Sequence, residues 1–150
     1  FYHFRNQEEI LVAVMALGIT STTEQLAAAL EVAQTPYDKV SALIHVHLNS
    51  LLGENQAALE VMLYEWRSVS AEQKPGLIVL RDRYEALWQS ALDEAAAAGV
   101  VGQDTRLLRR MVPGSLHWSV QWFRRDGGDS VDALAERMLK LVIGPRPQAD

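Results

Sequence analysis

Residues that could carry out catalysis or hold a metal ion are scattered along this chain and form no recognisable motif. The sequence contains no cysteine, so it offers no thiolate nucleophile and no thiolate metal ligand. His45 and His47 stand two residues apart, and on a helix this spacing directs the two imidazoles to different faces, where they cannot easily hold one metal ion. A glycine-rich phosphate loop and a His-Glu-x-x-His motif are also absent from the sequence. We therefore expect a protein that is not an enzyme and that needs no metal or cofactor.

The large side chains in the middle of the chain indicate a different chemistry, the binding of an apolar molecule. Tryptophan, methionine and tyrosine residues recur at helical spacing on stripes that we expect to face inward. Such stripes most often form only a packed core, so the pattern leaves a core and a ligand cavity both open. The candidate ligand-binding residues are His47, Met62, Trp66, Tyr84, Trp88, Met111, Ser115, His117 and Trp118, and the polar groups among them that could orient a ligand are His47, Tyr84, Ser115 and His117.

The hydrophobic pattern that must position these residues is helical throughout, which predicts an all-α bundle of about six helices. The first helix is expected to run from Asn6 to about residue 33, in preference to a break at the Ser21–Glu24 capping box. Further helices are expected after Thr35, over 59–66 and over 77–98, and the last two after Asp104 and Ser130. Pro113 lies inside the fifth of these helices and is expected to kink it.

The overall charge argues against nucleic-acid binding by the chain alone. The formal net charge is −5, and an acidic chain does not attract phosphate backbones through its overall field. No apolar run approaches the roughly 20 residues that cross a bilayer, and residues 1–5 do not resemble a signal peptide. We expect a cytoplasmic protein without membrane contact. Because the chain lacks an initiator methionine, we also expect it to be a fragment.

Two stretches resemble the TetR/AcrR family of bacterial transcriptional regulators. Residues 1–11 (FYHFRNQEEIL) resemble the end of the family's helix-turn-helix and the start of its connecting helix. Residues 116–127 (LHWSVQWFRRDG) resemble a tryptophan-rich signature that precedes the family's last helix. The chain departs from these patterns at three positions: Gln7 replaces a lysine that contacts a DNA phosphate, His117 replaces an asparagine and Arg125 replaces a proline.

The resemblance implies a domain organisation and a set of partners. Residues 1–5 would be a remnant of the DNA-binding domain, 6–144 the ligand-binding and dimerisation domain, and 145–150 a disordered tail. The last two helices would pair with their copies in a homodimeric four-helix bundle, with Trp122, Leu134, Met138 and Leu141 at the interface. In the parent protein, operator DNA would be bound through the mostly missing N-terminal head, with contacts from Tyr2, His3 and Gln7.

The function implied by the resemblance is that of a ligand-responsive transcriptional regulator, a repressor that senses a hydrophobic small molecule. The candidate effectors are an acyl-CoA, another lipid or an aromatic compound. For a CoA group, Arg81, Arg83, Arg109 and Arg110 are the basic residues available at a pocket mouth. The alternative is a helical dimerisation or scaffold module with no small-molecule ligand, whose interior would be filled.

Overall fold

The computed structural model describes residues 6–53, 56–123 and 127–143, and within these ranges the chain forms helices and no strands. This confirms the predicted all-α class. A 3₁₀ turn follows the third helix directly. The elements are α1 (Gln7–Val32), α2 (Pro36–Leu52), α3 (Gln56–Glu65), η1 (Trp66–Ser68), α4 (Lys74–Ala97), α5 (Thr105–Trp122) and α6 (Val131–Ile143).

The N-terminal caps lie where the sequence predicts them. The side chains of Asn6, Thr35, Asp104 and Ser130 each accept a hydrogen bond from a backbone N–H three residues later, at 2.9, 3.1, 3.2 and 3.0 Å. Each cap satisfies one of the donors that a helix start leaves unpaired. These four short polar side chains therefore set where α1, α2, α5 and α6 begin.

The first helix is continuous, as expected, and the capping-box residues inside it serve another purpose. Thr22 and Thr23 donate their hydroxyl hydrogens to the carbonyl oxygens of Gly18 and Ile19, at 2.9 and 2.7 Å. Each threonine thus satisfies its hydroxyl within the preceding turn, which lets it be buried without ending the helix. Of the helices described, α1 has the length and apolar composition needed to cross a membrane; it packs against α2, α3 and α4, and 28% of its most apolar window is buried.

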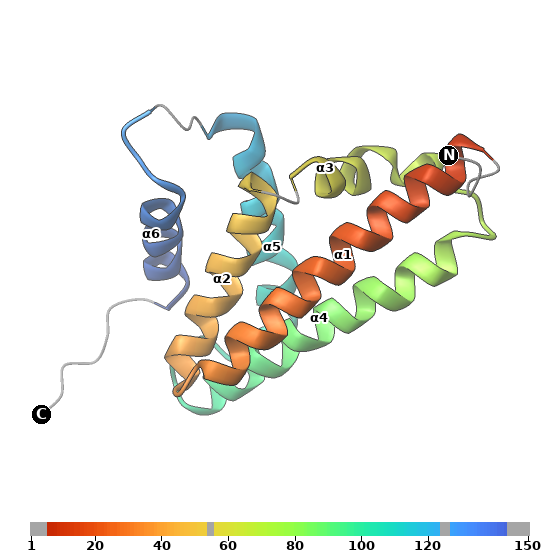
Figure 1. Cartoon of the computed structure of the whole chain (residues 1–150). Helices are drawn as coiled ribbons and strands as arrows, with labels where there is room; N and C mark the ends of the chain where they lie inside the picture. Colours follow the sequence, from red (N-terminus) through yellow and green to blue (C-terminus); the bar gives the residue numbers. More distant parts are fainter. Residues whose placement is uncertain (1–5, 54–55, 124–126, 144–150) are drawn as a thin grey trace, which may run out of the picture.

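Two long helices, α1 and α4, lie side by side and form the frame of the molecule (Figure 1). At one end α2 packs on both of them, α5 packs on α2 and α4, and α6 packs on the outside of α2. At the other end α3 packs on α1. Gly18 permits this contact, because a Cβ atom at Gly18 would stand 2.6 Å from the Cβ atom of Ala58 on α3.

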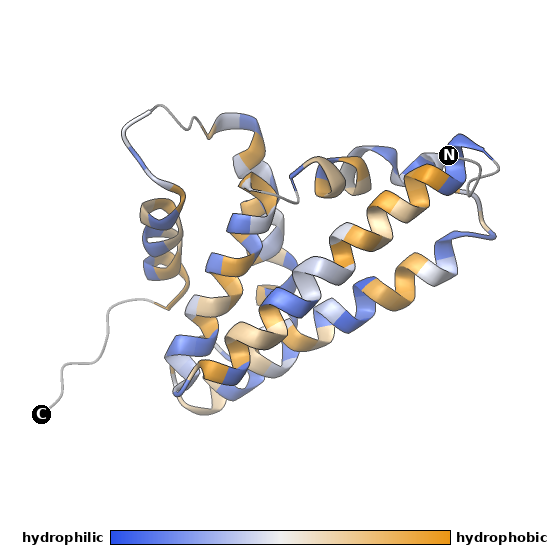
Figure 2. Ribbon diagram, in the orientation of Figure 1, coloured by the Kyte–Doolittle hydropathy of each residue, from blue (hydrophilic) through white to orange (hydrophobic). Residues whose placement is uncertain are grey.

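The buried apolar side chains form two separate clusters, and Figure 2 shows the apolar residues along the facing helices. The larger cluster includes Leu43, Leu48 and Trp88 and lies where α2, α4, α5 and α6 meet. The smaller one consists of Met15, Ile19, Val69 and Leu77 and lies near the start of α1 and α4. The frame helices α1 and α4 supply residues to both, so the two clusters are held at a fixed separation.

Candidate ligand-binding site

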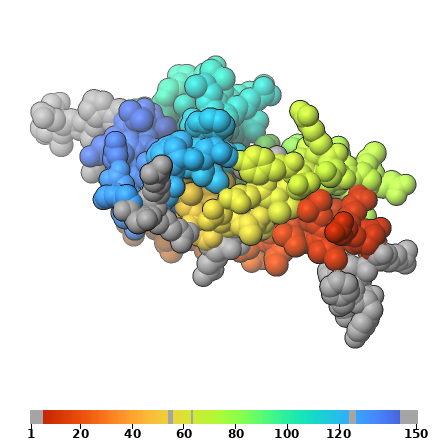
Figure 3. All heavy atoms as spheres, turned by 90° about the horizontal axis from the view of Figure 1, so that it is seen from above, coloured from red at the N-terminus to blue at the C-terminus, as the bar shows by residue number. Residues whose placement is uncertain are grey.

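A cavity of about 500 Å³ opens between the two clusters. Its walls come from α1, α2, α3, η1, α4 and α5, so every described helix except α6 contributes. Figure 3 shows α3 and the end of α2, in yellow, between α1 in red and the C-terminal part of α5 in blue. The lining residues are Ile19, Thr22, His47, Leu59, Met62, Trp66, Arg81, Tyr84, Glu85, Trp88, Arg109, Arg110, Pro113, Gly114 and His117.

The side of the cavity formed by α1, α3 and η1 is mainly apolar. Ile19, Leu59, Met62 and the Trp66 ring lie there. The Trp66 ring is also covered by two cations, the Lys74 Nζ atom at 5.7 Å and the Arg81 Cζ atom at 5.6 Å from the ring centroid. Cations at this distance over a tryptophan face are attracted by its quadrupole, which helps hold the ring against α4.

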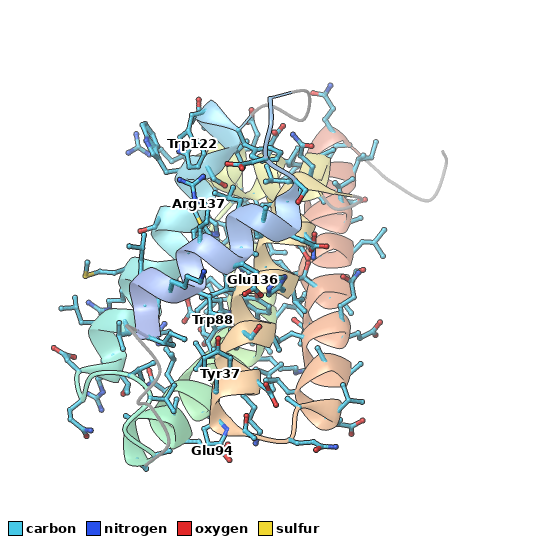
Figure 4. All side chains as sticks on the ribbon, turned by 90° about the vertical axis from the view of Figure 1, so that its left-hand side faces the viewer. Tyr37, Trp88, Glu94, Trp122, Glu136 and Arg137 are labelled. Carbon is cyan, nitrogen blue, oxygen red and sulfur yellow. The ribbon has the colours of Figure 1, made fainter. Side chains whose placement is uncertain are left out.

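The opposite side carries a buried aromatic and imidazole cluster centred on His47. The Nδ1 atom of His47 lies 2.6 Å from the Tyr84 hydroxyl oxygen. The ring stacks with His117 at a centroid distance of 4.8 Å and with Tyr84 at 5.6 Å, and it meets the Trp88 ring edge-on at 5.6 Å. Figure 4 shows Trp88 in the interior of the bundle. The Nε2 atom of His47 is buried and has no hydrogen-bond partner among the described residues.

Burial keeps these groups uncharged. Desolvation lowers the pKa of His47 well below its ordinary value, and the neighbouring His117 lowers it further. Desolvation also lowers the pKa of His117. Burial raises the pKa of Tyr84, and the nearby Trp88 indole N–H offsets part of this rise. The contact between the two groups does not meet the geometry of a hydrogen bond. At neutral pH this wall therefore offers neutral hydrogen-bonding groups.

Charged groups from α4 and α5 line the remaining part of the cavity. Glu85 forms an ion pair with Arg109 at 3.0 Å and a longer one with Arg81 at 3.9 Å. The Arg109 Nε atom also donates to the Gln89 side-chain oxygen at 3.0 Å, which fixes the guanidinium in place. Arg110 is exposed and lines the cavity as well. Three arginines against one glutamate give this part of the cavity, called the basic mouth below, an excess of positive charge.

The cavity brings together most of the predicted ligand-binding residues, namely His47, Met62, Trp66, Tyr84, Trp88 and His117. Met111, Ser115 and Trp118 do not line it, and the expectation that they face inward is wrong. Met111 and Trp118 are 59% and 68% exposed, and the Ser115 hydroxyl donates to the Met111 carbonyl oxygen on the outside of α5. The stripe that they share turns away from the cavity, because Arg109, Pro113 and His117 occupy the face of α5 that lines it.

Some cavity residues were not predicted. Ile19, Thr22, Leu59 and Glu85 line the cavity. The first three lie at apolar or small positions of amphipathic helices, where a residue that lines a hollow has the same pattern as one in a filled core. Glu85 is recognisable only once α5 is seen to place Arg109 beside it.

The described residues that were predicted to contact DNA or to form the dimer interface do not line the cavity. Tyr2 and His3 fall outside the described residues, and Gln7 is exposed at the first position of α1. At the predicted interface, Trp122 is exposed at the end of α5 (Figure 4), and Leu141 is 86% exposed. The expectation that Leu134 lies at the interface is wrong. Leu134 is only 5% exposed within one chain, because α6 turns this residue toward α2 and the larger cluster. Met138 is partly buried against the same cluster.

Comparison with known proteins agrees with this architecture. Residues 33–144, well over half of the chain, match the family model described as the C-terminal domain of tetracyclin-repressor-like proteins. The chain belongs to the TetR family. This confirms the resemblance found in the sequence.

The relatives of this TetR-family chain share its fold over nearly its whole length. The structure of the superantigen PfiT is 41% identical, covers 97% of this chain and 78% of its own, and gives a TM-score of 0.86. The structure of the regulator PfmR from Thermus thermophilus is 30% identical, covers 95% of this chain and 78% of its own, and gives a TM-score of 0.82. The fatty acid metabolism regulator protein of Bacillus subtilis (strain 168) is 24% identical over 95% of this chain and 75% of its own. A structure of a Bacillus subtilis regulator FadR with stearoyl-CoA, 23% identical, covers 95% of this chain and 78% of its own with a TM-score of 0.73, and shows the fold alone.

The neutral imidazoles predict a loss of stability on mild acidification. The ordinary pKa of histidine is 6.5, and burial lowers the pKa of both His47 and His117 in the folded state. Below this value the unfolded chain takes up protons that the folded chain does not, so stability is lost as the pH falls. We expect the free energy of unfolding to drop by about 1 kcal/mol through His47 between pH 6.5 and about pH 5.5, and His117 should add a loss of the same sign.

Urea unfolding followed by circular dichroism across this pH range measures the effect. His47→Phe should remove part of the pH dependence. The control His45→Phe should retain it, because His45 lies outside the cavity and contacts Glu136 at 2.8 Å. A wild-type stability that stays constant or rises on acidification would contradict the burial of neutral imidazoles.

Proposed function

We propose that this chain is the effector-sensing and dimer-forming body of a ligand-responsive transcriptional repressor in the cytoplasm. The observation that carries the proposal is the cavity of about 500 Å³, which combines an apolar side, neutral polar groups and a basic mouth. This volume lies within the range of small-molecule sites, and an apolar enclosure with a few convergent polar groups is their usual composition. A scaffold module that binds no ligand would instead favour a filled interior.

The effector class that fits these walls is an amphiphile with an apolar body and an anionic head. The apolar body would lie against Leu59, Met62 and Trp66. The anionic head would lie near Arg81, Arg109 and Arg110, where the excess positive charge of the basic mouth attracts it. A fatty acyl-CoA has both parts. Support comes from the relatives, because one is named a fatty acid metabolism regulator and another is described in complex with stearoyl-CoA.

The start of α1 would carry the response to a DNA-binding head, in which Tyr2, His3 and Gln7 would contact operator DNA. The Glu8 Oε1 atom accepts a hydrogen bond from the Ser70 backbone N–H at 2.7 Å, which ties the first turn of α1 to the segment after η1. Trp66 of η1 lines the cavity, so a ligand that displaces this ring would shift Ser70 and, through it, the start of α1. In a dimer, such a shift would change the spacing of the two heads and release the operator.

The exposed apolar face of α5 would form the dimer interface. Leu107, Met111, Trp118 and Trp122 are spaced four, seven and four residues apart, which places them on one side of the helix, and all four are at least half exposed. Leu141 adds a further exposed apolar side chain on α6. Large exposed apolar faces are characteristic of interfaces, and the family fold brings two copies together about a two-fold axis in a four-helix bundle.

The superantigen role stated for PfiT is not extended to this chain. The proposal rests on the interior cavity, and the exposed face of α5 already has an occupant in the proposed dimer. We propose no catalytic role for the titratable groups that line the cavity, which are two neutral histidines, a tyrosine, three arginines and a glutamate that is paired with arginine.

Reversing one charge at the basic mouth should weaken effector binding. We expect Arg110→Glu to reduce the affinity for palmitoyl-CoA by at least about tenfold, because it places a negative charge beside the anionic head. Isothermal titration calorimetry measures the change. The matched control is Arg83→Glu on α4, where the arginine is exposed and does not line the cavity, and its affinity should stay close to that of the wild type. Equal losses in both variants would show a general charge effect and exclude an anion site at the mouth.

A charge in the exposed face of α5 should separate the proposed dimer. We expect Trp118→Glu to be monomeric, because burying an unpaired carboxylate in an interface is strongly unfavourable. Analytical ultracentrifugation measures the mass. Val79→Glu makes a comparable change at a 59% exposed residue of α4 and should remain dimeric. A wild-type monomer would contradict the proposed dimer, and a Trp118→Glu dimer would place the interface elsewhere.

A further inference from the structure

We propose that His47 recognises a carbonyl oxygen of the effector, so that the cavity selects an acylated compound over one with the same chain and head but no carbonyl group. This inference rests on the proposed function, because it assigns a role to one residue within the same cavity. It identifies His47 as a specificity-determining residue and Tyr84 as the residue that positions its proton.

The hydrogen bond between Tyr84 and His47 sets which ring nitrogen carries the proton, and we assign the Tyr84 hydroxyl as its donor. Burial raises the pKa of Tyr84, so its hydroxyl keeps its hydrogen and is available as a donor. Donation of this hydrogen across the 2.6 Å contact makes the Nδ1 atom of His47 the acceptor. The single proton of the neutral imidazole then lies on Nε2. His47 therefore presents an N–H donor on the nitrogen that does not face Tyr84.

This donor has no partner among the described residues, although it is shielded from water. A buried N–H without an acceptor is unfavourable, and an acceptor supplied by a bound molecule would recover that loss. His47 itself lines the cavity. A ligand oxygen is therefore the partner that completes the chain of hydrogen bonds from Tyr84 through the imidazole ring.

The acceptor that fits this position is neutral. Desolvation lowers the pKa of His47, so the ring does not supply a positive charge for a carboxylate. The titratable groups that face the ring are His117, whose pKa is also lowered, and Tyr84. A carboxylate placed here would lose its hydration without gaining a counter-ion, whereas a carbonyl oxygen needs only the one donor. A free carboxylate is better placed at the basic mouth.

The location of His47 also fits a carbonyl that joins a chain to a head. The apolar side of the cavity comes from α1, α3 and η1, the basic mouth from α4 and α5, and His47 reaches the same cavity from α2. His117 covers one face of the ring at 4.8 Å, and it lies three residues after Gly114 on α5; a Cβ atom added at Gly114 would meet nothing within 4 Å. A rotation of the half-buried His117 ring would let a ligand oxygen approach Nε2.

The test compares two ligands that differ only in the carbonyl oxygen. Palmitoyl-CoA and the thioether hexadecyl-CoA share the chain length and the head, and calorimetry on the complete chain gives both affinities. We expect the thioester to bind about tenfold more tightly, as the loss of one hydrogen bond to a buried donor predicts. His47→Phe, which keeps a ring in the cluster, should abolish this preference. His45→Phe on the other face of α2 should retain it.

A second variant keeps the inference falsifiable if His47→Phe does not fold. Tyr84→Phe removes the hydroxyl that fixes the proton on Nε2, so the preference for the thioester should decrease, and the histidine ¹⁵N shifts should report a change in the tautomer of His47. Equal wild-type affinity for the two ligands would overturn the role of His47 and leave the proposed function standing. If neither ligand binds, the acyl-CoA proposal and this inference both fail.

Discussion

The fixed separation of the two apolar clusters is the constraint on which the rest of the structure depends. The helices α1 and α4 lie side by side and contribute to both clusters. They therefore fix the position of α2, α5 and α6 at one end and of α3 with η1 near the other. Gly18 lets α3 come so close to α1 that a side chain at this position would overlap Ala58. The space that remains between the clusters is the cavity, and its lining residues belong to helices that the clusters already hold in place. An effector would therefore meet helices that are already in place and would have to move only single side chains, such as the rings of Trp66 and His117.

The polar groups of the cavity are arranged so that charge increases toward the mouth. The imidazole cluster is kept neutral by desolvation, whereas the arginine side chains of α4 and α5 are cationic, and Glu85 offsets only part of their charge. One side of the cavity is therefore apolar, one offers neutral hydrogen bonds and one attracts anions. The same helices connect the cavity to the start of α1, because Trp66 and Ser70 belong to the segment between α3 and α4 and Ser70 is bonded to Glu8. Binding and response would thus share one short segment.

Much of the fold could be predicted from the sequence because its signals are local. Asn6, Thr35, Asp104 and Ser130 cap helices through bonds to residues three positions away, and the apolar spacing in each helix needs no knowledge of its neighbours. The kink expected at Pro113 stays a prediction. The helix α5 runs through this residue without a break. His47, Tyr84 and Trp88 were predicted as cavity residues because large polar-aromatic side chains on inward stripes suit a ligand site.

The errors arose on α5 and α6, where an apolar stripe can face the chain's own core, a cavity or a second subunit. Met111 and Trp118 were assigned to the cavity and are exposed, whereas Leu134 was assigned to the interface and is buried.

The central claim is that the interior cavity binds the effector, and a pair of tryptophan substitutions tests it most directly. Met62→Trp places a larger side chain in the cavity wall, whereas Val79→Trp adds a tryptophan at an exposed position of α4, outside the cavity and outside the proposed interface. Calorimetric titration of both variants with palmitoyl-CoA compares them with the wild type. The account predicts that binding is lost in Met62→Trp and unchanged in Val79→Trp. Wild-type affinity in a folded Met62→Trp variant would contradict it, because the ligand would then bind outside the cavity.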